Sequence, residues 1–129
     1  LGNNSGKNEK LIRLFELTGK IIDEPSEWDD CLDCASEFQK VKAALEYLTK
    51  LYAVLKKNNV TDYISFEPGI ISEYKYYTGI VFAGYTYGTG EPVVSGGRYD
   101  SLLARFGKDA PAIGFAIMAD QLMFALERQ

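Results

Sequence analysis

The spacing of apolar residues changes near residue 62, and this change limits the folds that the chain can adopt. Before that point apolar residues recur every three or four positions, which places them on one face of a helix. Beyond it the chain is rich in β-branched and aromatic residues separated by turns that contain Gly and Pro. Helices followed by strands predict an α+β fold with an antiparallel sheet. We therefore divide the chain into two segments, 1–61 and 62–129.

Two helices are predicted in the first segment, joined by an acidic connection that contains Pro25. The first helix covers 10–17. The second is predicted as one long helix from about 30 to 57, because six apolar residues step along it by three and four. These residues are Phe38, Val41, Leu45, Leu48, Tyr52 and Leu55.

The second segment alternates between strands and short helices. Strands are predicted at 63–66, at 76–87, from 93 onward and at 112–117. The second and third of these form a hairpin, because Gly88-Thr89-Gly90 is followed by Glu91-Pro92 and another strand, as in a turn and unlike a phosphate loop. Short helices are predicted at 101–106 and 119–127.

Composition excludes several classes of function for these 129 residues. The chain has no His, so it supplies no Ser–His or Cys–His pair, no imidazole base and no His-ligated metal. Its 14 Lys and Arg against 18 Asp and Glu disfavour a broad basic face for nucleic acid. No apolar run reaches the roughly 20 residues that cross a bilayer. We therefore expect no metal, no cofactor, and no membrane or nucleic-acid partner. Because no apolar signal segment follows Leu1, we also expect a cytoplasmic protein.

Cys31 and Cys34 have the spacing of a redox or metal-binding pair. A redox pair requires a lowered thiol pKa, whereas the neighbouring Asp29, Asp30 and Asp33 should raise it. A structural zinc ion requires four ligands, which two Cys and no His cannot supply. We therefore expect two ordinary reduced thiols.

A cluster of tyrosines is the first candidate site. Tyr77 lies beside Gly79 on one face of a predicted strand, and Tyr99 follows two glycines. Phenols beside small residues can form a concave wall of hydroxyl donors and acceptors that holds a small polar ring. Tyr is also a common half-buried residue of sheets, so packing without a ligand remains the alternative.

Three motifs in this part of the chain occur in a recognisable order. They are YYTGIVF at 76–82, GGRYDSLL at 96–103 and AIGFAI at 112–117. Together they resemble the histidyl-tRNA synthetase-like catalytic core, over about 63–129. The resemblance implies the C-terminal part of a class II synthetase-type antiparallel sheet, preceded by a helical insertion in residues 1–61. It also implies a histidine-type pocket formed by Tyr77 and Tyr99, and we expect Gly97 and Arg98 to take part in ligand binding there.

Three positions depart from the synthetase pattern. Ser72 and Gln121 stand where the synthetases carry Arg, and Met118 stands where they carry Gly. A hydroxyl and a neutral amide cannot supply the fixed positive charge that stabilises a transferring phosphate or carboxylate. The Met118 side chain would also occupy space that the synthetases leave for the nucleotide. These departures disfavour a working synthetase.

The pattern instead resembles the family of ATP phosphoribosyltransferase regulatory subunits, paralogues that lack aminoacylation. This resemblance implies a non-catalytic subunit that joins the catalytic subunit in a hetero-oligomer and supports the first step of histidine biosynthesis. It also implies feedback control by histidine and self-association. We interpret the chain as a C-terminal fragment of such a subunit. Two alternatives stay open: a fragment of a divergent histidyl-tRNA synthetase, and an interaction module whose pocket is filled.

Overall fold

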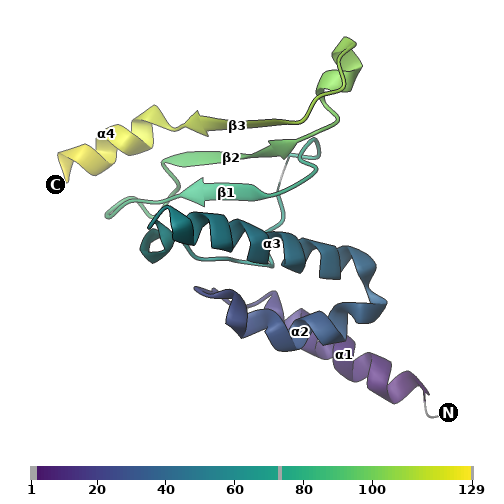
Figure 1. The fold of residues 1–129 in the computed structure, drawn as a ribbon. Helices are drawn as coiled ribbons and strands as arrows, with labels where there is room; N and C mark the ends of the chain where they lie inside the picture. The colour runs from purple at the N-terminus through teal and green to yellow at the C-terminus, as the bar shows by residue number, and fades with distance from the viewer. Residues whose placement is uncertain (1–2, 73, 129) are drawn as a thin grey trace. The chain divides into compact units, whose positions relative to one another are not determined.

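The computed structural model describes residues 3–72 and 74–128, and shows a helical unit and a sheet unit (Figure 1). The two compact units are Leu1–Ile70 and Ile71–Gln129. The predicted α+β class is confirmed, because the described residues form four α-helices and a three-stranded antiparallel sheet. Ile64 and Phe66, which follow the change of apolar spacing, pack in the helical unit.

The helical unit contains α1 (Asn3–Leu17), α2 (Asp29–Cys34) and α3 (Gln39–Lys57). Helix α1 begins seven residues before its predicted start, because the polar residues at its beginning give no apolar periodicity. The prediction of one continuous helix over 30–57 is wrong. A short 3₁₀ turn separates α2 from α3, and the chain leaves helical geometry at Phe38, with φ −118° and ψ 73°.

Burial explains this break between α2 and α3. Cys34 and Ala35 are buried in a small cluster with Leu14 of α1, and Phe38 packs against the same cluster. The 3₁₀ turn between α2 and α3 allows Cys34 and Ala35, before the break, and Phe38, at the break, to contact the same cluster. Burial of apolar surface therefore outweighs the local preference for an unbroken helix.

Trp28 is the centre of the main core of the helical unit. Its side chain is fully buried and its indole N–H donates to Thr49 Oγ1 at 3.1 Å. Phe66 meets the indole edge to face, with ring centroids 5.3 Å apart. Phe66 also exchanges two backbone hydrogen bonds with Ile22, of 2.9 and 2.7 Å. The predicted strand at 63–66 is therefore wrong in extent, since it is reduced to this one bridge.

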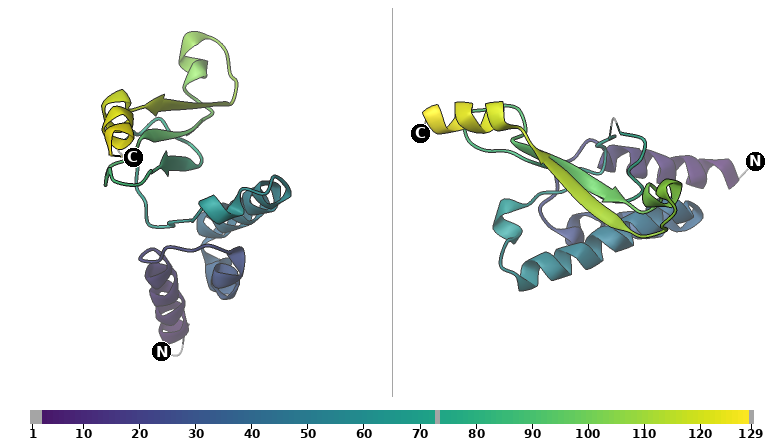
Figure 2. Two further views of the ribbon diagram at one scale, coloured as in Figure 1. Left: turned by 90° about the vertical axis from the view of Figure 1, so that its left-hand side faces the viewer. Right: turned by 90° about the horizontal axis from the view of Figure 1, so that it is seen from above.

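The sheet unit contains β1 (Val81–Gly84), β2 (Val94–Tyr99) and β3 (Ala112–Ile117) in the order β1-β2-β3. Both neighbouring pairs are antiparallel, so the predicted hairpin is confirmed. Helix α4 (Ala119–Glu127) continues beyond the end of β3, as Figures 1 and 2 show. The predicted short helix at 101–106 is a 3₁₀ turn over Leu103–Phe106.

The predicted strand at 76–87 is wrong in length, because only 81–84 is regular. The backbone N–H groups of Thr78 and Gly79 both point to the carbonyl oxygen of Arg98, at 2.9 and 3.3 Å. Two residues opposite one acceptor interrupt the ladder in the manner of a bulge.

No helix within 3–72 or 74–128 is both long enough and apolar enough to cross a bilayer.

Candidate functional site

Four tyrosines gather over one face of the sheet. Tyr74, Tyr76 and Tyr77 come from the segment before β1, and Tyr99 ends β2. The ring centroids lie 4.6 Å apart for Tyr76 and Tyr77, and 5.9 Å apart for Tyr76 and Tyr99. Those of Tyr77 and Tyr99 lie 6.5 Å apart. These separations fall in the range of favourable aromatic contacts, and the structure thus brings the two predicted pocket tyrosines together.

These tyrosines border a pocket of about 320 Å³. The volume lies at the lower end of the range for small-molecule sites. The polar and larger lining side chains include Tyr74, Tyr76, Tyr77, Tyr99, Ser95 and Met118. Among the described residues that line the pocket, none carries a formal charge at neutral pH. The pocket therefore offers hydroxyls, aromatic faces and a thioether, which suit a small neutral ring.

Two glycines form the floor on which the tyrosine rings lie. Gly97 of β2 and Gly114 of β3 are direct partners across the sheet. A Cβ atom added to Gly97 would lie 2.7 Å from Cδ1 of Tyr77, and one added to Gly114 would lie 2.9 Å from the Tyr99 hydroxyl. Real Cβ atoms do not approach so closely. Glycine at both positions therefore allows the rings to lie against the backbone.

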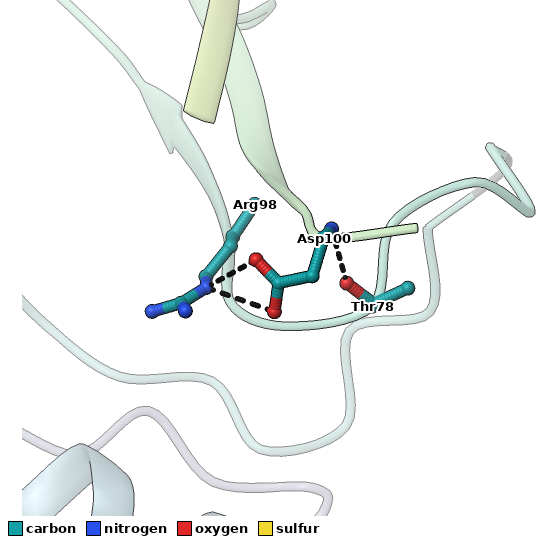
Figure 3. Close-up of polar contacts among 3 residues, drawn as sticks. All are labelled: Thr78, Arg98 and Asp100. Carbon is teal, nitrogen blue, oxygen red and sulfur yellow. Dashed lines mark hydrogen bonds and ion pairs between the residues drawn. The ribbon is translucent and has the colours of Figure 1, made fainter. Parts of the chain in front are cut away.

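Arg98 lies on the other side of β2, because successive side chains of a strand point to opposite faces. Its Nε donates to both carboxylate oxygens of Asp100, at 2.8 and 3.1 Å (Figure 3). Neither Arg98 nor Gly97 lines the pocket, although Gly97 supports the ring of Tyr77. Of the four predicted pocket residues, Tyr77 and Tyr99 line the pocket, Gly97 lies beneath the Tyr77 ring, and Arg98 lies on the other face of β2.

Ser95 and Gly114 are pocket residues that the sequence analysis missed. Both lie on the same face of the sheet as Gly97. Ser95 is two residues before Gly97 on β2, and Gly114 is the partner of Gly97 on β3. Alternation along the strands would have found them once the pairing of β2 with β3 was known. Met118 follows β3 and lines the pocket, whereas Gln121 in the first turn of α4 does not.

The Tyr76 hydroxyl has a raised pKa. A side-chain hydrogen bond with Tyr77, followed by desolvation, raises the pKa of Tyr76 above its usual value. The Tyr76 hydroxyl is therefore neutral and able to donate a hydrogen bond at physiological pH. A neutral hydroxyl at Tyr76 is compatible with an uncharged ring.

Cys31 and Cys34 lie in the helical unit. Cys31 is half-buried and Cys34 is buried, and both are free. Burial raises the pKa of the Cys31 thiol, and the neighbouring Cys34 and Asp30 raise it further. Within 3–72 and 74–128, the structure contains no cluster of three or more Cys, Asp or Glu arranged to hold a metal ion.

Alkylation of Cys31 by iodoacetamide is expected to respond to folding. Because folding raises the thiol pKa, the thiolate fraction at any given pH is smaller than in the unfolded chain. The rate of alkylation rises with pH as the thiolate forms. It should therefore reach half of its maximum at a higher pH in the native protein than in urea, where the thiol pKa is about 8.5. Peptide mapping by mass spectrometry separates Cys31 from Cys34. A lower midpoint in the native protein would contradict the expected direction.

Comparison with known proteins gives consistent matches. The family model described as histidyl-tRNA synthetase matches residues 1–122. The ATP phosphoribosyltransferase regulatory subunit of Clostridium kluyveri is 42% identical over an alignment of 132 positions, which covers 98% of this chain and 32% of that protein. The chain spans about a quarter to a third of the length of the curated relatives that it matches.

Two solved structures have the same fold. An ATP phosphoribosyltransferase regulatory subunit/histidyl-tRNA synthetase from Bacillus halodurans C is 45% identical with a TM-score of 0.62, covering 66% of this chain and 22% of that chain. A histidine–tRNA ligase subunit from Alicyclobacillus acidocaldarius is 41% identical with a TM-score of 0.67, covering 70% of this chain and 27% of that chain. The predicted class II synthetase-like fold is thus confirmed. With a match over nearly its whole length, the chain belongs to the histidyl-tRNA synthetase family, and curated relatives at 34–46% identity are named ATP phosphoribosyltransferase regulatory subunits.

Proposed function

We propose that this chain is part of a non-catalytic regulatory subunit of ATP phosphoribosyltransferase and that its tyrosine pocket binds histidine. The names of the curated relatives support the subunit assignment. The pocket supports histidine as the ligand, because its size and its neutral hydroxyl-bearing wall suit a small polar ring.

One observation argues most strongly for a regulatory role over a catalytic one. Met118 lines the same pocket as Tyr77 and Tyr99, and no described lining residue is cationic. Activation of an amino acid by ATP requires positive groups that stabilise charge on the phosphates. The described lining residues therefore suit an amino-acid ring better than a triphosphate.

The organisation of the parent subunit follows from the same proposal. Residues 1–61 correspond to a helical insertion, and residues 62–129 to the C-terminal part of a synthetase-like core. The partners are the catalytic subunit of ATP phosphoribosyltransferase, in a cytoplasmic hetero-oligomer, and further copies of the regulatory subunit. Histidine regulates this assembly only if it binds one arrangement of the complex more tightly than another.

The second candidate is a fragment of a divergent histidyl-tRNA synthetase. The similarity to a solved structure named histidine–tRNA ligase subunit favours it. Histidine-dependent pyrophosphate exchange separates the two functions when it is measured on the longest natural form of the protein. The regulatory proposal predicts exchange at background, and exchange clearly above background would contradict it.

Removal of single pocket hydroxyls is expected to weaken histidine binding. Tyr77→Phe and Tyr99→Phe should each raise the dissociation constant by about 2- to 13-fold, the equivalent of one hydrogen bond of 0.5–1.5 kcal/mol. Isothermal titration calorimetry measures this change. Tyr87→Phe is the matched control, because Tyr87 is 89% exposed and does not line the pocket. Equal, measurable affinities in all four proteins would place the histidine site outside this pocket. The absence of binding by all four proteins would instead support a filled, non-binding pocket.

A further inference from the structure

The segment that carries Tyr77 is tied to β2 by its backbone. Thr78 and Gly79 donate to the carbonyl oxygen of Arg98, at 2.9 and 3.3 Å, and the Arg98 N–H donates to the carbonyl oxygen of Ile80 at 2.8 Å. The segment therefore stays attached to one residue of β2 although it is not a regular strand. Tyr77 immediately precedes these ties, so they determine where its ring can lie.

A side-chain contact adds a second tie to the same segment. The backbone N–H of Asp100 donates to Thr78 Oγ1 at 2.8 Å, across 22 residues of sequence. The carboxylate of Asp100 in turn accepts from Nε of Arg98, as Figure 3 shows. The ion pair is 39% and 42% exposed, so it adds little stability by itself. It links Asp100, whose N–H donates to Thr78, with Arg98, whose carbonyl oxygen accepts from the same segment.

Two glycines, Gly79 and Gly97, allow the segment that carries Tyr77 to lie close to β2. A Cβ atom added to Gly79 would lie 3.1 to 3.3 Å from three carbon atoms of the Arg98 side chain, which packs over that position. On the other face, a Cβ atom added to Gly97 would meet the Tyr77 ring at 2.7 Å. The Thr78 segment is therefore fixed against one face of β2 while the Tyr77 ring is fixed against the other.

We propose that Thr78, Arg98 and Asp100 form a latch that positions Tyr77 and thereby sets the affinity of the pocket. None of the three residues lines the pocket, so they act through Tyr77 as positioning residues. The role in affinity rests on the proposed binding of histidine. A ligand that binds to an unlatched segment must also order that segment, which lowers its affinity without removing any contact.

Thr78→Val tests the latch because Val has nearly the same shape but cannot accept the hydrogen bond from Asp100. Histidine binding, measured by calorimetry, should weaken by about 2- to 13-fold, the equivalent of one hydrogen bond of 0.5–1.5 kcal/mol, because this bond is exposed and water can satisfy the Asp100 N–H. Thr78→Ser keeps the hydroxyl and should stay within about twofold of the wild type. Thr89→Val is the matched control, because Thr89 Oγ1 also makes backbone hydrogen bonds in the sheet unit, in the turn before β2. It should leave affinity unchanged.

Amide hydrogen exchange of the free protein gives a second readout that does not depend on histidine. Exchange at residues 78 and 79 should accelerate by about tenfold in Thr78→Val, and should not accelerate in Thr78→Ser. If the wild type binds histidine and Thr78→Val binds it equally well, the latch is overturned. If the wild type does not bind histidine, the proposed pocket ligand fails, and the latch is then judged by exchange alone. Unchanged exchange in Thr78→Val would overturn it in that case.

Discussion

Replacement of Gly97 by Ala is expected to weaken histidine binding by about 5- to 160-fold. The new methyl group would lie 2.7 and 2.8 Å from two ring carbons of Tyr77 and 3.0 Å from the carbonyl oxygen of Ile80. The carbonyl oxygen belongs to the backbone, so the ring has to move instead. Overpacking of this kind costs roughly 1–3 kcal/mol, and about 1.4 kcal/mol corresponds to a factor of ten in binding. Isothermal titration calorimetry gives the affinity directly.

The matched control for this substitution is Gly19→Ala. A Cβ atom at Gly19 would have its nearest neighbour, the Glu16 carbonyl oxygen, at 3.8 Å, which is an ordinary contact. This variant should therefore bind histidine as the wild type does. Wild-type affinity in Gly97→Ala, with an unchanged unfolding midpoint, would show that the Tyr77 ring is not part of the binding site.

Replacement of Trp28 by Ala is expected to destabilise the helical unit by about 3–5 kcal/mol. Trp28 is fully buried, and Ala would leave a cavity lined by Phe66 and the other residues of the main core. The substitution also removes the donor to Thr49. Urea unfolding followed by circular dichroism at 222 nm measures the change, because the variant has lost the single Trp of the chain.

Thr49→Val separates the two contributions of the indole. It removes the acceptor of the indole N–H and keeps the ring, so it should cost about 1–3 kcal/mol. A loss of less than about 1 kcal/mol in Trp28→Ala would contradict the assignment of Trp28 as the centre of this core.

The sequence predicted the elements that depend on local pattern, and it failed where distant contacts decide. The strand at 112–117 and the helix at 119–127 agree with the structure because periodicity and turns specify them. The break at Phe38 depends on burial of Ala35 against α1, which no local pattern contains. The irregular pairing just before β1 arises because the N–H groups of Thr78 and Gly79 share the carbonyl oxygen of Arg98, which lies about twenty residues farther along the chain.

The candidate site divides in the same way. Tyr77 and Tyr99 were predicted because motifs and neighbouring glycines mark them in the sequence. Ser95 and Gly114 were missed, because their place in the pocket follows from the register of β2 against β3. Arg98 was grouped with the pocket because of its motif, whereas the alternation of side chains along β2 places it on the other face.

Chemical-shift mapping with ¹⁵N-labelled protein tests the central claim most directly. Titration with histidine should shift the backbone amides of residues around the pocket, chiefly Gly97, Gly114 and Met118, and titration with ATP should leave the same amides unchanged. Histidine-dependent shifts confined to other parts of the chain, or ATP-dependent shifts at Met118, would contradict the proposal that this pocket holds an amino acid and excludes a nucleotide.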